Sequence, residues 1–233
     1  MLRDILENKP TWIHSADTHG RLPLHYAASI GYIEGVVHLI DICKCCTNQR
    51  DKYGYYPIHL ASYDGHVEVV EKLFEYCSDP AQMLDTSFKR NILHVAAKNG
   101  KHEVVQYILL QSHRIPELHN MINQKDNKGD TPLHLAAQSC HPKTVFYLTW
   151  DERVDLHLVN QNNQTALDVV NAISQLHDTS TREVRIIDFD RFELLVFQSI
   201  VDFPSNIDYN LELLTSVLIF RLKFTIQLIF NYN

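Results

Sequence analysis

The sequence predicts an all-α solenoid of about five repeats with a divergent C-terminal tail. The first observation is a Leu/Ile-His-x-Ala phrase that occurs four times, with steps of 34, 35 and 40 residues between its histidines: His25, His59, His94 and His134. The second is a degenerate fifth copy, which places Asp168 a further 34 residues along the chain. Segments that recur at such a period are expected to pack on their neighbours as an array.

Each copy is expected to begin with a tight turn that leads into an inner helix. One turn position favours residues that tolerate a positive φ, and it holds Gly20, Gly54, Gly129 and, in the last copy, Asn163. Lys89 stands there in the third copy and predicts an irregular turn. Proline suits the first helical position, where its missing N–H costs nothing. It predicts inner helices that start at Pro23, Pro57 and Pro132.

The caps of the inner helices differ between copies. Asn91, Thr131 and Thr165 precede the helices of copies three, four and five and are good N-cap residues. Leu22 and Tyr56 hold the same position in copies one and two and cannot cap with a side-chain oxygen. A pair of small residues after each histidine is expected to let neighbouring inner helices approach closely.

A glycine is expected to end each inner helix before an outer helix begins. Gly31, Gly65 and Gly100 hold this position, whereas Cys140 replaces glycine in the fourth copy and predicts a distorted corner. Apolar residues at helical spacing predict outer helices over 33–40, 67–74, 103–110 and 143–148. The long third step is assigned to an inserted loop over 111–122, which contains Pro116.

The core Thr-Pro-Leu-His-x-Ala of copy four, Thr131 to Ala136, at a period near 33 residues is the signature of ankyrin repeats. The array is therefore predicted to span residues 17–175. Residues 1–16 are expected to form a partial N-terminal repeat or cap, and residues 176–233 a divergent apolar tail.

Within this class the array resembles the plant ankyrin-repeat proteins of the accelerated-cell-death-like family. The resemblance covers about residues 1–172 and is carried by residues 24–32, 50–62, 91–101 and 123–134. It implies a role in plant defence, salicylate-linked and cell-death signalling, with the repeats on the cytoplasmic side of a membrane. Members of that family continue into a Pro-Gly-Gly region with several membrane helices. This sequence contains no Pro-Gly-Gly and lacks that membrane region.

Other classes of function find little support. The net charge of -7, without a run of Lys or Arg, does not favour nucleic acid. The four repeat histidines are interpreted as structural groups that bridge turn backbones, and His14, His19, His66 and His141 as solvated side chains. Cys43, Cys45 and Cys46 are not followed by a second pair at zinc-finger spacing, so no metal site is expected. No catalytic constellation is found, and no cofactor is expected.

A protein partner is expected to bind on the concave face, which turn tips and inner helices would line. Aromatic and arginine side chains are enriched among residues that dominate binding energy. The candidate contacts are therefore Tyr53, Tyr55, Tyr63, Phe88, Arg90, Lys98 and Lys128. The alternative for Tyr53 and Tyr55 is that their rings pack against the next turn.

The apolar tail suggests an alternative role for the chain. Leu213 to Phe220 is an apolar run, followed by Arg221 and Lys223 and then by a second apolar stretch. The two cations argue against a spanning helix. The alternative function is a membrane-associated signalling regulator, held through the tail or through the missing region. The expected location is the cytoplasm or the cytoplasmic face of a membrane.

Overall fold

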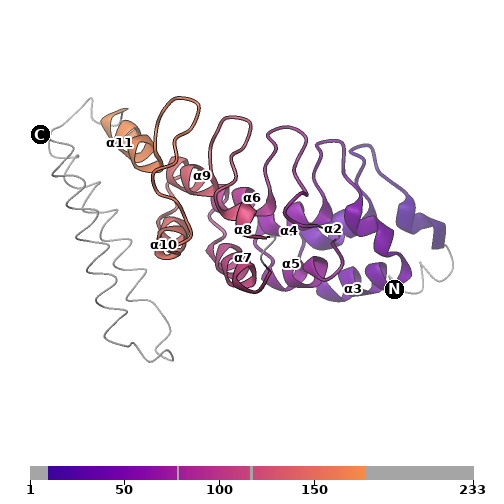
Figure 1. Cartoon of the computed structure of the whole chain (residues 1–233). Coiled ribbons are helices and arrows are strands. Elements are labelled where there is room, and N and C mark those ends of the chain that lie inside the picture. The colour runs from indigo at the N-terminus through magenta and orange to yellow at the C-terminus, as the bar shows by residue number, and fades with distance from the viewer. Residues whose placement is uncertain (1–9, 78, 116–117, 177–233) are drawn as a thin grey trace, which may run out of the picture. The chain divides into compact units, whose positions relative to one another are not determined.

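The computed structural model describes residues 10–77, 79–115 and 118–176, and every regular element in these ranges is a helix. The inner helices are α2 (Pro23–Ser29), α4 (Pro57–Asp64), α6 (Ile92–Lys98), α9 (Pro132–Gln138) and α11 (Ala166–Leu176). The outer helices are α3 (Ile33–Ile42), α5 (Val67–Phe74), α7 (His102–Arg114) and α10 (Pro142–Trp150). Inner and outer helices form two rows, with the turn tips projecting beyond the inner row (Figure 1), and this confirms the predicted solenoid.

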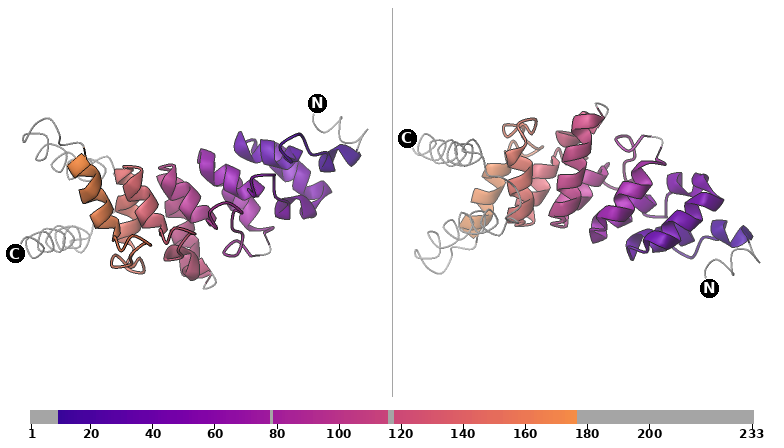
Figure 2. Two further views of the ribbon diagram at one scale, coloured as in Figure 1. Left: turned by 90° about the horizontal axis from the view of Figure 1, so that it is seen from above. Right: turned by 90° about the horizontal axis from the view of Figure 1, so that it is seen from below.

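The helices pack in the order in which they occur along the chain. Helix α2 packs on α4, α4 on α6, α6 on α9 and α9 on α11, and the outer helices contact one another in the same succession (Figure 2). The small pairs lie inside these contacts, where Ala28, Ala61, Ala96 and Ala136 have no exposed surface. The predicted close approach of the inner helices therefore depends on these small side chains.

The turn glycines are required by both backbone conformation and space. Gly129 has a φ of 76°, and a Cβ built on it would lie 2.8 Å from the backbone nitrogen of Gln161 in the next tip. A Cβ on Gly54 would overlap Thr86. Any other residue at these positions would strain its own turn and also separate neighbouring tips.

Lys89 confirms the expected irregularity of the third turn. Its φ is 58°, so it adopts the left-handed conformation that glycine holds elsewhere. The turn it belongs to is closed by the N–H of Asp85 donating to the carbonyl of Arg90, 2.9 Å away, whereas the second turn is closed between Asp51 and Tyr55 at 2.9 Å. The third turn therefore contains one more residue than the second.

The expected distortion at Cys140 is wrong. Cys140 has a φ of 53° and its N–H donates to the carbonyl of Ala137 at 3.1 Å, as the N–H of Gly100 donates to that of Ala97 at 3.3 Å. The cysteine thus follows the glycine geometry. Its side chain is exposed, so it meets no neighbour that would forbid a left-handed backbone.

The prediction of a loop over 111–122 is also wrong in part. Helix α7 continues to Arg114, and a short helix α8 (His119–Ile122) follows. Leu118, Met121 and Ile122 are almost fully buried, and α8 packs on α7. The insertion is helical because these apolar side chains, three and four residues apart, gain a common buried face.

Before the first inner helix lies a 3-10 helix, η1 (Pro10–His14), whose Ile13 is 2% exposed in the core. A second, η2 (Lys44–Asn48), follows α3. The predicted tail over 176–233 lies outside the described residues apart from Leu176, and residues 1–9 of the predicted cap lie outside them as well. Among the described residues, no helix has the length and apolar character needed to span a membrane.

Candidate binding surface

The turn tips are organised by an acidic or amide residue that the sequence analysis left without a role. In the second tip, the carboxylate of Asp51 accepts backbone N–H groups from Tyr53 and Tyr55, both at 2.9 Å. The same arrangement is formed by Asp17, Asp126 and Asn160 in their own tips. A side chain that satisfies two backbone donors holds each tip in one conformation. These Asp and Asn residues open four of the five copies and were visible in the sequence.

The four repeat histidines join each repeat to the next, as predicted. Their Nε2 atoms lie 3.0–3.2 Å from backbone carbonyls of the following tip, in Tyr55, Arg90, Asp130 and Gln164. A carbonyl only accepts, so Nε2 carries the proton and donates. Burial lowers the pKa of His25, and it lowers those of His59 and His94 to about 4. These three rings are therefore neutral at pH 7.

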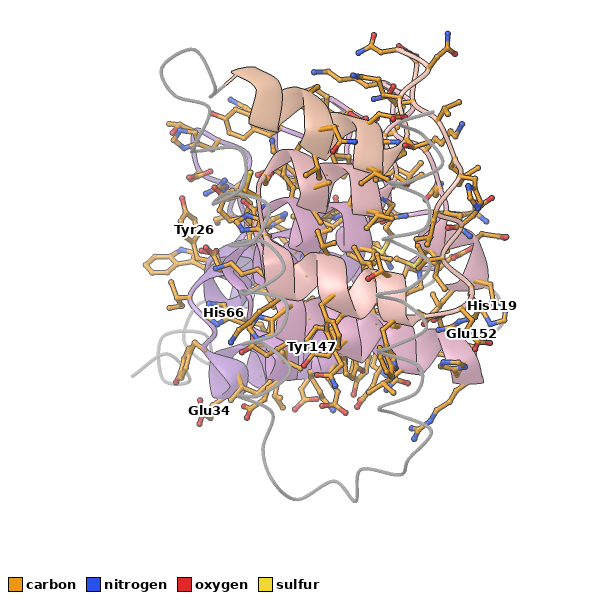
Figure 3. The ribbon with its side chains drawn as sticks, turned by 90° about the vertical axis from the view of Figure 1, so that its left-hand side faces the viewer. Tyr26, Glu34, His66, His119, Tyr147 and Glu152 are labelled. Atoms are coloured by element: carbon orange, nitrogen blue, oxygen red, sulfur yellow. A yellow bond between two sulfur atoms is a disulfide. The ribbon has the colours of Figure 1, made fainter. Side chains whose placement is uncertain are left out.

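The interpretation of His66 and His141 as solvated side chains is wrong. The Nε2 of His66 donates to the carbonyl of Ser29 at 2.9 Å, and that of His141 to the carbonyl of Lys98 at 3.1 Å. His66 lies on the same edge of the array as Tyr26, opposite the edge that carries His119 and Glu152 (Figure 3). Each ring therefore satisfies a carbonyl at the end of the inner helix of the preceding repeat, where intrahelical partners are missing.

Charged pairs form a further link between neighbouring tips. The Nε of Arg21 lies 3.1 Å from Asp51, and the Nε of Arg90 lies 2.9 Å from Asp126. Tyr55 occupies the corresponding position between these two arginines and supplies no cation. In the described part of the chain, Asp85 accordingly has one buried carboxylate oxygen without a hydrogen-bond partner. The connection between tips two and three therefore lacks the ion pair that its neighbours have.

Two of the predicted contact residues are large exposed aromatics. Tyr53 and Tyr63 are each 50% exposed, and they lie on the second tip and at the end of helix α4. The ring of Tyr53 stacks on His19 of the preceding tip, with centroids 6.1 Å apart, and not on the next turn as the packing alternative had it. Tyr55 is only half-buried, and burial raises the pKa of its hydroxyl. Tyr53 and Tyr63 thus leave part of their ring surface exposed.

A second group centres on Phe88, a half-buried residue of the third tip. The guanidinium of Arg90 lies 4.4 Å from the Phe88 ring centroid, and the ammonium of Lys128 lies 5.8 Å from it. Lys98 lies nearby and is exposed. Partial desolvation and the positive charges of Arg90 and Lys128 lower its pKa. The structure therefore brings Phe88, Arg90, Lys98 and Lys128 into one cationic cluster around an aromatic ring.

Arg90 differs from its prediction in one respect. It was predicted to contact a partner directly, but Arg90 is only 7% exposed. The Arg90 guanidinium is held by Asp126 and covered by Phe88. A direct partner contact from this side chain would need it to leave a buried ion pair, so we assign it a supporting position beneath Phe88.

Tyr26, an aromatic residue on α2, was not among the predicted contact residues. Tyr26 is 44% exposed, and its hydroxyl donates to Asp17 at 2.5 Å. That hydrogen bond is the main reason why the pKa of Asp17 lies well below its usual range. The residues one place after the histidine are buried in later copies, as Leu60 and Leu135 are, whereas Tyr26 at the same position of the first copy is exposed.

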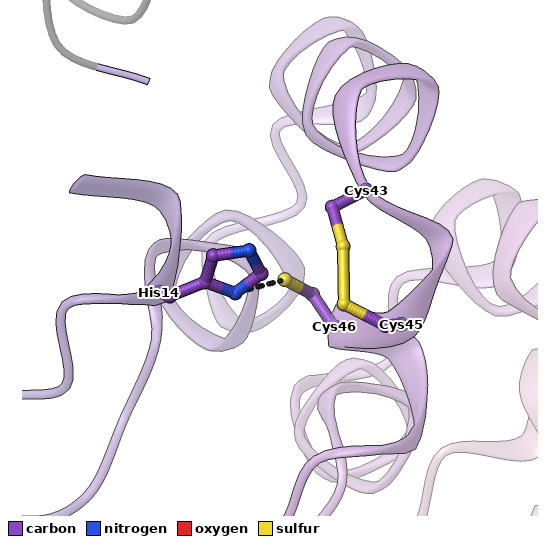
Figure 4. Close-up of side chains that lie close together, drawn as sticks. All are labelled: His14, Cys43, Cys45 and Cys46. Carbon is purple, nitrogen blue, oxygen red and sulfur yellow. Dashed lines mark hydrogen bonds between the residues drawn. A yellow bond between two sulfur atoms is a disulfide. The ribbon is translucent and has the colours of Figure 1, made fainter. Parts of the chain in front are cut away.

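A separate cluster at the N-terminal end of the array combines one imidazole with three sulfur atoms. The ligand atoms of His14, Cys43, Cys45 and Cys46 all lie within 4.8 Å of one another. Cys43 and Cys45 form a disulfide, and the buried thiol of Cys46 lies 3.6 Å from Nδ1 of His14 (Figure 4). No metal site was expected, since no second cysteine pair follows at zinc-finger spacing; the fourth donor is His14, which lies 32 positions before Cys46, in η1.

Comparison with known proteins identifies the repeats. The family described as "Ankyrin repeats (3 copies)" matches residues 2–83 and 58–160. A probable serine/threonine-protein kinase of Dictyostelium discoideum is 32% identical over 83 residues, which is 35% of this chain and 9% of the kinase. The chain therefore spans less than a tenth of that relative, and the likeness covers only the repeat region, which carries no evidence of catalysis.

Proposed function

The chain belongs to the ankyrin-repeat family, a non-enzymatic interaction fold, and from this we propose that it is an adaptor that binds a protein partner through its tips and inner helices. We define the contact surface by Tyr53, Tyr63, Phe88, Lys98 and Lys128, with Tyr55 and Arg90 as its supporting residues. The observation that carries the proposal is the half-exposed pair of tyrosines beside the cationic cluster on Phe88.

The rigidity of the tips and the kind of surface they expose both favour binding. Tips held by side-chain and inter-repeat hydrogen bonds lose little conformational freedom when they bind. Aromatic rings with cations beside them combine apolar area with charge, as residues that dominate interfaces do. The exposed cations Lys98 and Lys128 near Phe88 favour a partner segment that carries a carboxylate next to an apolar or aromatic group.

The test compares proteins captured from a plant extract by three immobilised chains. These are the unmodified chain, the double variant Tyr53→Ala with Phe88→Ala, and Leu110→Ala as control, since Leu110 is 58% exposed on the outer helix α7. We expect the double variant to lose the specific partner at least tenfold, with unchanged circular dichroism, while the control retains it. Equal capture by the double variant would show that the partner binds elsewhere.

The resemblance to the accelerated-cell-death-like proteins suggests a signalling process and a location for the adaptor. We infer from it that the partner belongs to plant defence or stress signalling and that the adaptor acts in the cytoplasm or at the cytoplasmic face of a membrane. The alternative function is a membrane-associated regulator. It is favoured by the apolar sequence of residues 213–230, which lie outside the described residues.

Fractionation distinguishes the two proposals. Cell membranes are washed with carbonate and probed with an antibody raised against residues 17–140. A soluble band at 27.1 kDa would support the free adaptor. A carbonate-resistant band above 27.1 kDa would instead show that these repeats belong to a longer membrane protein. A carbonate-resistant band at that mass would assign the membrane contact to this chain itself.

A further inference from the structure

The cluster of His14, Cys43, Cys45 and Cys46 joins the two 3-10 helices at the N-terminal end of the array. His14 is the last residue of η1, Cys43 directly follows α3, and Cys45 and Cys46 lie within η2. The buried side chain of Ile13 fixes η1 in the core and thereby positions the imidazole of His14. Tertiary packing therefore brings His14 to the three cysteines, because the four donors do not form one continuous sequence motif.

The donor set and its spacing suit a tetrahedral zinc ion. With bonds of roughly 2.3 Å to sulfur and 2.0–2.1 Å to nitrogen, a sulfur and a nitrogen on one zinc ion lie about 3.6 Å apart. The Sγ of Cys46 lies 3.6 Å from Nδ1 of His14. All four ligand atoms fall within 4.8 Å of one another, so only small side-chain shifts would complete the tetrahedron. Soft thiolates and an imidazole without carboxylates disfavour calcium and magnesium.

The surroundings also fit a structural metal site. Cys46 has no exposed surface and Thr47, the next residue, is buried, which shields one side of the cluster from water. His14 and Cys45 are exposed and leave a path by which an ion can enter. A site of three cysteines and one histidine has four protein ligands and no open position, which is the arrangement of structural rather than catalytic zinc.

We propose that the reduced chain binds one zinc ion through His14, Cys43, Cys45 and Cys46. Reduction must come first, because Cys43 and Cys45 are joined in a disulfide. Two equivalents of a thiol reductant cleave that bond to two thiols and are themselves joined as a disulfide. Zinc then replaces the three thiol protons, which pass to solvent, and it takes the unprotonated nitrogen of His14, so the filled site has a net charge of about −1.

The consequence is a metal link that fastens η1 onto the first repeat. A ligand that binds only the folded chain stabilises it by mass action. The link would join η1 to the end of α3 and to η2. The site lies apart from Tyr53, Tyr63 and Phe88 in sequence and shares no residue with the contact surface, so this inference is independent of the proposed function.

The experiment titrates cobalt(II), and then zinc, into the full chain after reduction by a phosphine and removal of metal by a chelator. We expect one equivalent of cobalt to give the intense visible bands of tetrahedral cobalt with sulfur-to-cobalt charge transfer, and zinc to abolish them. The variants Cys46→Ala and His14→Ala should bind at least tenfold more weakly. Cys140→Ala is the matched control, because Cys140 is an exposed free cysteine outside the cluster.

Several results would overturn the proposal. The absence of a tetrahedral cobalt spectrum would do so, as would equal affinity in the unmodified chain and in His14→Ala. Binding by the chain with its Cys43–Cys45 disulfide intact would show that other ligands hold the metal. Should Cys46→Ala fail to fold by circular dichroism, His14→Ala decides alone, because its exposed side chain leaves the core untouched. Zinc should also raise the melting temperature of the reduced chain, and of Cys140→Ala, but not that of His14→Ala.

Discussion

Lys89 shows how one residue can depart from the pattern without changing the fold. In the described part of the chain it is one of three residues other than glycine with a positive φ, together with Cys140 and Asn163. A side chain in this conformation costs about 1–2 kcal/mol relative to glycine. Asn163 reduces the cost because its short polar side chain tolerates the left-handed region, whereas lysine has no such compensation. The third tip is therefore locally strained.

Replacing Lys89 by glycine is expected to raise the free energy of unfolding by about 0.5–1 kcal/mol, since the relief of strain exceeds the added chain entropy of glycine. Urea unfolding followed by circular dichroism measures the change. Ser87→Gly is the control, because Ser87 lies in the same exposed tip without a positive φ and should lose about 0.5–1 kcal/mol. A similar loss of unfolding free energy in both variants would contradict the strain at Lys89.

Among the elements, helices with the same role begin in different ways. The hydroxyl of Thr131 caps α9 by accepting a hydrogen bond from the backbone N–H of His134 at 3.5 Å. The same hydroxyl lies 2.8 Å from Nδ1 of His134. Tyr56 provides no side-chain cap to α4, and among the described residues the Nδ1 of His59 is buried without a partner. Thr131, three positions before the histidine, thus caps the helix and also orients the ring that bridges two repeats.

Thr131→Ala is therefore expected to cost about 1–2 kcal/mol of stability, because α9 loses its cap and the His134 ring loses a hydrogen bond. Thr131→Ser keeps the hydroxyl and should stay within about 0.5 kcal/mol of the unmodified chain. The two variants are compared by thermal and urea unfolding. A serine variant as unstable as the alanine variant would mean that the methyl group, and not the cap, is responsible.

At the scale of the whole molecule, the histidine bridges make stability depend on pH. Burial lowers the pKa values of His59 and His94 to about 4, while an exposed imidazole in the unfolded chain has a value near 6.5. Between these values the unfolded chain binds protons that the folded chain does not. The free energy of unfolding must consequently fall as the pH falls from about 6.5 towards 4, and these two rings cause no further loss below that.

From pH 7 to pH 5 we expect each of these two rings to contribute a loss of about 2 kcal/mol. Urea unfolding at both pH values measures the difference. The double variant His59→Gln with His94→Gln should be less stable at pH 7 but should lose much less on acidification, since glutamine does not titrate. An equally steep loss in the double variant would assign the pH dependence to other groups.

The repeat turns, helix starts and helix ends are determined by the sequence itself, because each depends on residues only a few positions apart. Glycine permits a positive φ, proline begins a helix, and the histidine phrase recurs at the repeat period, so the solenoid and its inner helices could be predicted. The bridging role of the four histidines was expected from the ankyrin signature, in which the histidine bridges turn backbones. The helical insertion was missed because Pro116 was given more weight than Leu118, Met121 and Ile122.

Tertiary structure decided the contacts between residues roughly thirty to forty positions apart. It buried Arg90 against Asp126, gave His66 and His141 carbonyl partners in the preceding repeat, exposed Tyr26, and placed His14 beside three cysteines. The physical reason is that turn chemistry is local, whereas burial and partnership depend on which faces the stacking of repeats brings together. The sequence alone determined an array of helical repeats, and only the packing of those repeats determined which side chains are available to a partner or a metal ion.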